Sequence, residues 1–500
     1  MSNIQRYGPI FCSFLAGALS ALSFAPTYYI WCFLISFPTL LWLLKRSTSV
    51  FQSFFIGWGF GVGYFLSGLY WISYALLVDS NLFGWLIPFA VIIIPASLGL
   101  YIGILTLILH RFRNQDTKLV LLLSTLWVIF EIIRTSLFTG FPWLALGYSL
   151  TNHLTIIQSA SLFGVFGLSF LVILISLIPF VIFSNFGKTK LHKIYYLIIS
   201  TLLLIANWSY GEWRLKNSDI ETLTYSVRIV QPNISQSIKW SEDHRQAHLK
   251  KLMDMSRGAE QTYIIWPEAA VPYSLNSKEV RNFIKTIIPE NSYLITGGIR
   301  ESYSPILQYW TSLFILDHRG DIVDHYDKTH LVPFGEYIPM RGLIPSSLRK
   351  ITHGLMDYSK GEESNKILKP SPELPSFRGL ICYESFFPQE IITKDQDPDF
   401  LLNITNDAWY GESPGPYQHF DIARFRSIEF GLPSIRVANT GISAVISAKG
   451  EILQQIGLNH EGIIIANIPQ KNKKKTLYHL YGMKGKVVFF AIILFGTLCF

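Results

Sequence analysis

Three short polar clusters contain the residues whose types could do chemistry. Each follows an apolar run that is typical of a buried strand. The clusters are IIWPEAAVPY (264–273) with Glu268, YDKTHLVPFGEYIP (326–339) with Lys328 and Glu336, and GLICYESFFP (379–388) with Cys382, Tyr383 and Glu384. Because loops at strand ends present side chains that the sheet holds in place, active sites of α/β proteins gather there. We therefore expect a carboxylate, an ammonium and a thiol in one site.

These three residue types together can perform acyl transfer. A free thiol has a pKa of about 8.5 and is mostly protonated at neutral pH. A carboxylate within hydrogen-bond reach can take its proton as attack begins, and a nearby ammonium stabilises the thiolate. The ammonium can also stabilise the oxyanion of a tetrahedral intermediate, together with a backbone N–H after the cysteine. Cysteine, lysine and glutamate thus supply a nucleophile, an electrostatic stabiliser and a general acid and base.

A plain structural role is the alternative for each residue. Lysines and glutamates are usually solvated surface residues, and a buried cysteine can be a small hydrophobe. However, the other cysteines, Cys12, Cys32 and Cys499, lie in apolar stretches, so Cys382 is the one cysteine of the polar region. It cannot form a disulfide within that region, which marks it as a candidate reactive thiol.

Charged residues are distributed unevenly along the 500-residue chain. Residues 1–207 hold only 10 of the 42 Lys and Arg and 3 of the 34 Asp and Glu. This predicts a membrane part followed by a water-soluble part, because a span tolerates few charges. Seven of the eight net positive charges lie in the first part. The basic excess therefore indicates membrane topology and not binding of nucleic acid.

Seven stretches before residue 210 are apolar enough to cross a membrane, which takes roughly 20 residues. Residues 7–44 are interrupted by SFAPTYY and should form two helices with a turn near Pro26. Further spans are expected at 53–78, 82–110, 119–138, 156–184 and 194–209, with a short eighth span at 487–500. The predicted domains are a helix bundle at 1–209, a soluble domain at 210–484 and a C-terminal span at 485–500.

Basic residues in the short loops predict the orientation. Arg6, the Lys45/Arg46 loop and the loops 111–118 and 187–193 are basic, whereas the alternate connections near 26–28, 78–82 and 139–155 contain no Lys or Arg. Since basic loops stay on the cytoplasmic side, the N-terminus should be cytoplasmic. After seven crossings the soluble domain would lie outside the cytoplasm, which in a bacterium means the periplasmic side of the inner membrane.

Two charged residues fall inside a predicted span. Glu131 and Arg134 lie three positions apart, so on a helix they could pair with each other. Clamping of helices is one interpretation of this pair, and a direct role with lipid headgroups is the other.

The soluble region alternates strand and helix patterns. Strands are expected at 225–230, 263–266, 293–299, 313–317, 377–383 and 400–405, and helices at 242–258, 278–288 and 418–430. Glycines in HRGD (318–321) and AKGE (448–451) indicate two hairpins. The pattern predicts a mixed α/β layered domain in which helices cover sheets.

The order WPE, DKTHLVPFGE, CYE resembles the nitrilase, or carbon–nitrogen hydrolase, superfamily, and the whole chain is similar to its membrane-embedded branch, the apolipoprotein N-acyltransferase family. The matching segments cover nearly the full length. They are FAP (24–26), GWGFGVGYFLSGLYW (57–71), TGFPWLALGYS (139–149), QPNISQSIKW (231–240), KTHLVPFGEYIP (328–339), CYESFFP (382–388) and TNDAWYGESPGPYQH (405–419). Pro232 and Ser235 depart from the family's Gly and Pro, which affects the shape of that loop and not the chemistry.

The resemblance implies a bundle of about eight spans that carries an α-β-β-α sandwich domain, and an acyl transfer in two steps. Cys382 would take an acyl chain from a phospholipid, typically the sn-1 chain of phosphatidylethanolamine, as a thioester. The α-amino group of an N-terminal S-diacylglyceryl cysteine of an apolipoprotein would then accept the chain. This is the last step of lipoprotein maturation. A thioester relays the chain without external energy, and the sequence has no GxxxxGK[ST] loop, so no cofactor is expected.

The resemblance also implies roles for single residues. Glu268 would be the general base and then acid, and Lys328 would stabilise the oxyanion. Glu336 would hold Lys328 or Glu268. Tyr383 and Glu384 would shape the pocket and its hydrogen bonds. Trp240 would line the path of the acyl chain or headgroup, with ordinary packing as the alternative.

Two further features are open to several interpretations. The apolar segments 340–356 and 408–417 could form a greasy mouth of the site or be surface loops without a role. His325, His330 and His419 have no recognisable metal spacing, and we expect each to be structural and no metal to be bound.

Two competing functions remain. A membrane-tethered amidase or nitrilase would release the acyl group to water, which the three residue types alone do not exclude. The matching membrane half, including TGFPWLALGYS, argues against it, because a simple anchor would not need that match. A transporter or scaffold that binds acyl chains without turnover would tolerate replacement of Cys382.

Overall fold

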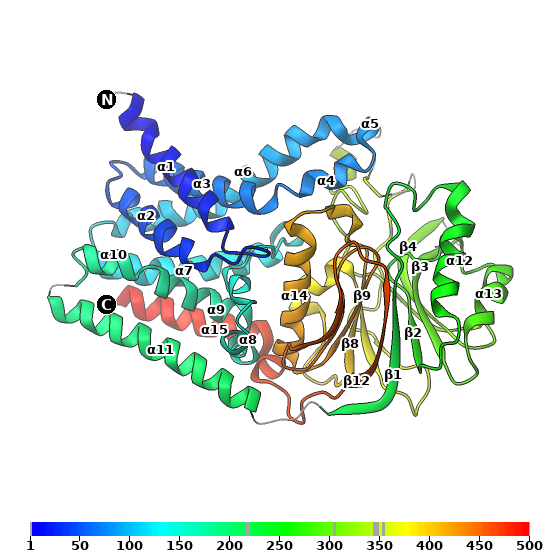
Figure 1. Cartoon of the computed structure of the whole chain (residues 1–500). Coiled ribbons are helices and arrows are strands. Elements are labelled where there is room, and N and C mark those ends of the chain that lie inside the picture. Colours follow the sequence, from blue (N-terminus) through cyan, green and yellow to red (C-terminus); the bar gives the residue numbers. More distant parts are fainter. Residues whose placement is uncertain are drawn as a thin grey trace. The chain divides into compact units, whose positions relative to one another are not determined.

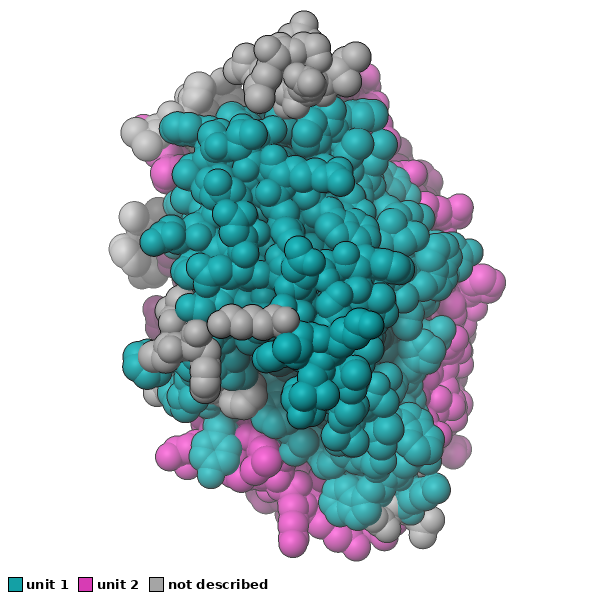
Figure 2. Space-filling view, turned by 90° about the vertical axis from the view of Figure 1, so that its left-hand side faces the viewer, with its two compact units in different colours: residues 1–73, 85–218, 481–500 teal, residues 74–84, 219–480 magenta. Residues whose placement is uncertain are grey.

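The computed structural model describes residues 3–187, 189–216, 221–303, 307–343, 350–352 and 356–499. Internal contacts divide the chain into two units, which Figure 2 colours separately (Figure 1; Figure 2). Residues Met1–Ser73, Trp85–Ser218 and Tyr481–Phe500 form what we call the helical unit. Residues Tyr74–Gly84 and Asp219–Leu480 form what we call the sheet unit.

The helical unit consists of α-helices joined by short turns. They are α1 (Asn3–Ala21), α2 (Phe33–Lys45), α3 (Val50–Leu69), α6 (Ile87–Leu109), α7 (Asp116–Ser136), α8 (Leu154–Ile157), α9 (Ala160–Ser176), α10 (Ile178–Phe183) and α11 (Lys190–Lys216). Two short helices, α4 (Ile72–Leu77) and α5 (Ser80–Phe83), lie where the chain passes between the helical unit and the sheet unit. Helix α15 (Leu477–Cys499), near the other end of the chain, also spans a boundary between the units.

Several of these helices could cross a membrane. Within the described residues, five are long and apolar enough: Val50–Leu69, Ser80–Phe112, Asp116–Thr139, Ala160–Phe183 and Lys190–Lys216. Tyr7–Ala21 and Ile30–Lys45 are apolar but shorter, and the chain turns between them where SFAPTYY predicts a turn. The eighth predicted span, 487–500, belongs to α15, which begins earlier, at Leu477. The number of eight spans stays a prediction.

Glycines in the GWGFGVGYFLSGLYW segment let helix α3 pack closely on its neighbours. A Cβ added at Gly63 would lie 2.0 Å from the carbonyl oxygen of Phe14 in α1. One at Gly57 would lie 1.9 Å from Oγ1 of Thr106 in α6. Small residues at such crossings allow the close backbone approach on which helix association in membranes depends.

The charged residues of α7 fasten one segment of the helical unit. The carboxylate of Glu131 accepts the backbone N–H of Leu146 at 2.9 Å, and the guanidinium of Arg134 donates to the carbonyl of Phe141 at 2.9 Å. Both side chains are buried. Both hydrogen bonds reach the TGFPWLALGYS segment. This agrees with the structural interpretation of Glu131 and Arg134, in which they hold parts of the helical unit together.

The sheet unit contains two six-stranded sheets. The order in the first is β12 (Gly462–Pro469), β1 (Thr222–Gln231), β2 (Tyr263–Ile265), β3 (Tyr293–Ser302), β4 (Gln308–Leu316) and β5 (Ile322–Asp327). The order in the second is β11 (Ile452–Ile456), β10 (Ser443–Ile446), β9 (Ser434–Ala438), β8 (Phe400–Thr405), β7 (Phe377–Ile381) and β6 (Ile367–Leu368). Strands β1 to β3 are parallel, as are β7 to β9. The hairpins β4–β5 and β10–β11 turn at HRGD and AKGE, so both predicted hairpins are confirmed.

The two sheets pack face to face and helices cover their outer faces. The core between the sheets includes Ile229 and Ile265 from the first sheet and Leu402 and Val437 from the second. Helices α12 (Arg245–Ser256) and α13 (Lys278–Ile284) pack on the first sheet, and α14 (Pro414–Phe430) on the second. In Figure 1 the layers of this unit follow one another from α14 through β8 and β9 to β1 and β2, and then to α12 and α13. The layers confirm the α-β-β-α sandwich.

Local sequence explains the ends of α14, the helix that covers the second sheet. Ser413 caps its N-terminus, since its hydroxyl accepts the backbone N–H of Gly415 at 3.1 Å, and Pro414 occupies the first turn. Gly431 ends the helix in the left-handed conformation, with φ of 67°. The helix predicted at 418–430 is therefore confirmed, with one additional turn at its start.

Candidate active site

The predicted nucleophile begins the turn that ends strand β7. Strand β7 is buried along its full length, and Cys382 starts a 3-10 helix, η9 (Cys382–Phe386). Its φ of 50° is unusual for a residue other than glycine, and such backbone strain is often found at functional sites. The hydroxyl of Ser385 donates to the Cys382 carbonyl at 3.0 Å, which holds the turn closed. The Cys382 side chain is buried in the sheet unit.

Glu268, Lys328 and Glu336 form a buried row of charges in the same unit. Glu268 follows β2 and Lys328 follows β5, as the strand-end argument predicts. The Nζ of Lys328 lies 2.9 Å from Oε1 of Glu336 and 3.7 Å from Oε1 of Glu268. The other oxygen of Glu336 accepts the backbone N–H of Val332 at 2.8 Å. The resemblance implies that Glu336 holds either Lys328 or Glu268. In the structure, Glu336 forms its hydrogen bond with Lys328.

The charges of Glu268 and Lys328 act on the Cys382 thiol. Burial and, after it, the Glu268 carboxylate raise the pKa of the Cys382 thiol to about 12, against the opposing effect of the Lys328 ammonium. Burial also raises the pKa of Glu268, against the influence of Lys328. Burial alone would lower the pKa of Lys328, but the carboxylates of Glu336 and Glu268 raise it above its ordinary value. The site at neutral pH therefore holds a protonated thiol and a charged ammonium, and a thiol in this state would need a base in order to act as a nucleophile.

Glu384 connects the Cys382 turn to the loop that carries Lys328. Its Oε2 accepts the backbone N–H of Ile381 at 2.8 Å, directly before the cysteine. Its Oε1 accepts the backbone N–H of Thr329 at 2.7 Å and the phenol O–H of Tyr326 at 2.6 Å. The guanidinium of Arg378 donates to the same phenol at 3.1 Å. Glu384 thus lies behind the site and holds two loops in register.

Comparison with known proteins assigns the chain to a family. Residues 16–178 match the apolipoprotein N-acyltransferase N-terminal domain, and residues 226–476 match carbon-nitrogen hydrolase. Proteins named apolipoprotein N-acyltransferase from Rickettsia typhi and Rhodopseudomonas palustris are 38% and 36% identical to this chain. Both alignments cover 96% of this chain, with 96% and 93% of the relatives. The chain belongs to the apolipoprotein N-acyltransferase family. The resemblance seen in the sequence is therefore confirmed, including its nitrilase-like domain.

Tyr383 and Trp240 are two further residues that the apolipoprotein N-acyltransferase resemblance points to. Tyr383 is buried among rings, with centroids 5.1 Å from Phe386 and 5.0 Å from Phe387. Trp240 is half-buried at the end of the loop 232–240. The preceding residue, Lys239, donates from Nζ to the Glu268 carbonyl at 3.1 Å. This contact brings the loop of Trp240 to the predicted base, but the lining role of Trp240 stays a prediction.

An acidic side chain outside the three polar clusters lies beneath Cys382, and it was not predicted. Asp407 follows β8, and its carboxylate contacts His419 Nδ1 at 2.8 Å and Arg436 at 2.9 Å. His419 Nε2 in turn lies 3.4 Å from the Cys382 carbonyl. All three side chains of this network are fully buried. The sequence carries a signal for it, because Asn406 and Asp407 follow a predicted strand in the same way as the three polar clusters.

The buried charges also act on two tyrosines outside the predicted set. The charges of Glu336 and Glu268 contribute to raising the pKa of Tyr358, after burial, and those of Cys382 and Asp407 do so for Tyr410. Tyr410 belongs to the apolar segment 408–417. In the other apolar segment, Met340 and Met356 are exposed, while residues 344–349 and 353–355 lie outside the described part of the chain.

The histidines have protein partners. His330 Nδ1 lies 2.9 Å from Glu390, and His419 binds Asp407. Across the described residues, no group of three or more His, Cys, Asp and Glu side chains could hold a metal ion.

Proposed function

We propose that this chain transfers an acyl chain from a phospholipid to the N-terminal S-diacylglyceryl cysteine of apolipoproteins, through a thioester on Cys382. The observation that carries the proposal is the buried row in which Lys328 joins Glu268 and Glu336 and influences the Cys382 thiol, in a chain aligned along 96% of its length with apolipoprotein N-acyltransferases. A nucleophile, a base and an ammonium in one buried site are what acyl transfer requires.

In the first half-reaction, Glu268 takes the proton of Cys382 as the sulfur attacks the ester carbonyl of the phospholipid. The oxyanion that forms is stabilised by the Lys328 ammonium, whose charge the two carboxylates maintain. Collapse of the tetrahedral intermediate breaks the bond to the glycerol oxygen, which takes the proton from Glu268. The products are a thioester and a lysophospholipid.

In the second half-reaction, the α-amino group of the lipoprotein cysteine attacks the thioester. Glu268 accepts the proton of the amine, the C–S bond breaks, and the proton returns to the sulfur of Cys382. An amide forms and the free thiol is restored. Because the acyl chain moves from an ester to a thioester and then to an amide, no external energy source is needed.

Hydrolysis by a membrane-tethered amidase is the less favoured function. The match to the family's N-terminal domain spans residues 16–178, which lie outside the carbon-nitrogen hydrolase match. A hydrolase that needed only an anchor would not require that similarity. The scaffold alternative gives no reason for the charges buried around a cysteine.

The setting of the reaction is a bacterial membrane. The relatives come from bacteria, and five helices of the described residues could span a bilayer. We further propose phosphatidylethanolamine as donor, a cytoplasmic N-terminus and a periplasmic catalytic domain at 210–484, between the bundle at 1–209 and the span at 485–500. Lys473, whose side chain is 87% exposed, offers a test of orientation. A Lys473→Cys variant should react with an impermeant maleimide in cells with a permeabilised outer membrane, and protection there would contradict the proposed side.

Intact mass of the detergent-purified protein tests the reaction itself. After incubation with phosphatidylethanolamine, the protein should gain one acyl chain that hydroxylamine removes, and Cys382→Ala should gain none. Addition of a diacylated lipopeptide should then discharge the protein and leave a triacylated peptide. Discharge to free fatty acid, with the peptide unchanged, would establish a hydrolase, and a folded protein that gains no chain from any phospholipid would refute acyl transfer.

A further inference from the structure

Lys239 is a buried ammonium next to the predicted base. Its side chain is almost fully buried, and its Nζ donates to the backbone carbonyl of Glu268 at 3.1 Å. Within the described residues, no carboxylate oxygen lies within the 4.0 Å of an ion pair with it. Burial of a charge without a paired carboxylate is costly, so a lysine at this position requires a reason other than stability.

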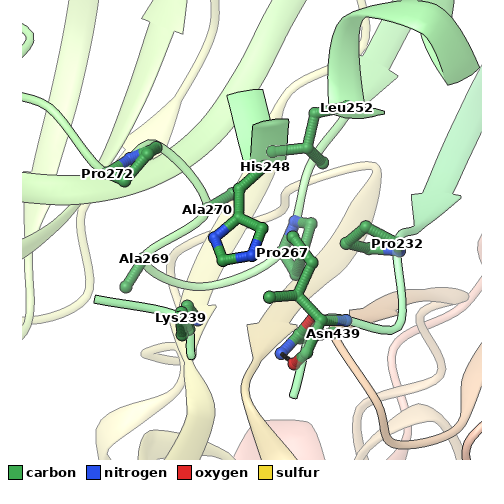
Figure 3. A pocket seen from close by; sticks show the side chains of 10 residues that line it. Pro232, Lys239, His248, Leu252, Pro267, Ala269, Ala270, Pro272 and Asn439 are labelled. Carbon is green, nitrogen blue, oxygen red and sulfur yellow. Dashed lines mark hydrogen bonds between the residues drawn. The ribbon is translucent and has the colours of Figure 1, made fainter. Parts of the chain in front are cut away.

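The surroundings of Lys239 offer it little other solvation. It lines a small cavity together with Pro232, Ile234, Leu252 and Pro267. The volume of this cavity is about 10 Å³, which leaves room for about one water molecule. Figure 3 shows Lys239 beside the turn that contains Pro267 and Ala269, with the ring of His248 facing the same cavity. The charge of Lys239 therefore acts mainly on what is close to it, and that is the Glu268 peptide.

The turn that carries Glu268 is held tightly. Ala269 has a φ of 48°, in the left-handed region, and a Cβ added at Gly297 would lie 2.5 Å from its backbone nitrogen. Lys239 adds a side-chain hydrogen bond to this turn, at the Glu268 carbonyl. Glu268 thus has two buried lysines near it, Lys328 at its carboxylate and Lys239 at its peptide.

We infer that Lys239 is a positioning residue that keeps the Glu268 carboxylate charged and in place to take the proton of Cys382. This inference rests on the proposed acyl transfer. Its sign follows from electrostatics, because a positive charge near a carboxylate favours the ionised form. In agreement, Lys239 lowers the pKa of Glu268, against the larger effect of burial. Burial lowers the pKa of Lys239 itself to about 8, while Glu268 raises it, so the ammonium is charged at neutral pH.

Other groups also face the two residues, and they stay in place when Lys239 is changed. Those that influence Glu268 are the ammonium of Lys328, the carboxylate of Glu336, the thiol of Cys382, the phenols of Tyr358 and Tyr410, and the backbone N–H of Asn406. His248 is the titratable group that lines the cavity with Lys239. Burial lowers the pKa of His248, a hydrogen bond with the Lys239 backbone opposes this, and the charges of His244, Lys239 and Lys251 lower it further.

The pH dependence of the first half-reaction tests the inference. The rate of thioester formation from phosphatidylethanolamine is measured by intact mass between pH 4.5 and 9, for the unchanged protein and for Lys239→Met, Lys239→Gln and Lys239→Arg. Loss of the charge raises the pKa of Glu268, so the acid side of the profile should move to higher pH in Met and Gln. We expect the rate on that side to fall about 3- to 10-fold, which corresponds to a shift of up to about one pH unit, and to recover at high pH.

The three variants separate charge from hydrogen bonding. Glutamine keeps an N–H donor without the charge, and arginine keeps the charge, so Gln should behave like Met, and Arg like the unchanged protein. Lys251→Met serves as the control, because Lys251 lies in α12, its Nζ pairs with the Glu461 carboxylate at 2.7 Å, and its charge is not among those that act on Glu268. Methionine suits the apolar walls of the cavity, so the neutral variants should purify folded.

Three results would overturn the inference. The first is a rate that falls equally at every pH in Lys239→Met and Lys239→Gln. The second is an unchanged pH profile in Lys239→Gln. Either result would mean that Lys239 contributes only its hydrogen bond to the Glu268 carbonyl and not its charge. The third is failure of both neutral variants to fold. Absence of a thioester in the unchanged protein at any pH would instead refute the proposed function, so the two failures are distinct.

Discussion

The carboxylate of Glu384 accepts a hydrogen bond from the backbone N–H of Thr329 at 2.7 Å. This bond connects the turn that begins at Cys382 to the residue that follows Lys328. Cys382 and Lys328 lie on different sheets, at the ends of β7 and β5. Their relative position therefore depends on a connection between the sheets at this edge. Glu384 supplies it without facing the substrate, because both of its oxygens are used by backbone and phenol donors.

Replacement of Glu384 by glutamine should separate these two loops. Glutamine has the same shape, but its NH2 group would face an N–H or O–H donor whose hydrogen bond the carboxylate now accepts. We expect about 100-fold slower thioester formation, because small displacements of reacting groups have effects of this size, and a loss of about 2 kcal/mol in stability. Intact mass gives the rate and thermal melting in detergent gives the stability. Glu390→Gln is the matched control, since Glu390 binds His330 in the same region but is 37% exposed. Equal effects in both variants would contradict the special role of Glu384.

Glu268→Gln should have opposite effects on two reactions of Cys382. The Glu268 carboxylate contributes, after burial, to raising the pKa of the thiol to about 12. Without that charge the pKa should fall, so the thiolate becomes more populated and the midpoint of alkylation by iodoacetamide should move to lower pH. Thioester formation should nevertheless slow by about 100- to 10,000-fold, because the base is lost. An alkylation midpoint that stays in place or moves to higher pH would show that Glu268 does not act on the thiol through its charge.

The sequence predicted where the residues of the candidate site lie, because strand ends can be recognised. Strands β7 and β8 are buried on both faces, so they appear as uninterrupted apolar runs, and the strand predicted at 400–405 is confirmed with the same bounds. The polar residues that follow such runs are then easy to find. Cys382, Glu268 and Lys328 are all singled out in this way, and their catalytic roles stay predictions.

The remaining parts of the site depend on contacts between distant segments. Lys239 gives no local signal beside Trp240, since lysines are almost always exposed and nothing in the sequence shows that this one turns inward. His419 was expected to be structural, and its partners Asp407 and Arg436 come from the ends of other elements. Strand β12 pairs with β1 across more than two hundred residues of sequence, and β6 has only two residues, so neither has a clear local pattern.

Asp407→Asn should weaken the protein most at neutral pH. Burial alone would raise the pKa of Asp407, but Arg436 and His419 outweigh it and hold the pKa at about 2. Since the unfolded value is about 3.9, the stabilisation is fully present above about pH 4 and is lost as pH falls toward 2; it amounts to about 2 kcal/mol. The difference in melting temperature between the variant and the unchanged protein should therefore shrink from pH 5 to pH 2.5. Asp397→Asn, at an exposed pair with Lys471, should show almost no difference at any pH. A difference for Asp407→Asn that does not change with pH would mean that its charge is not what stabilises the fold.

Lys328→Met should cost both stability and activity, and a second change should restore only the stability. The side chain of Lys328 is 1% exposed, and its removal leaves the carboxylates of Glu268 and Glu336 buried without their shared cation. Breaking such a buried group typically costs about 3–5 kcal/mol, whereas removal of both charges of a pair is close to neutral. The double variant Lys328→Met/Glu336→Gln should therefore recover more than half of the lost stability in thermal melting. Thioester formation should stay at least about 100-fold slow in both, because the oxyanion has lost its ammonium. Recovery of the rate together with the stability would show that Lys328 only balances charge, and its role at the oxyanion would then have to be abandoned.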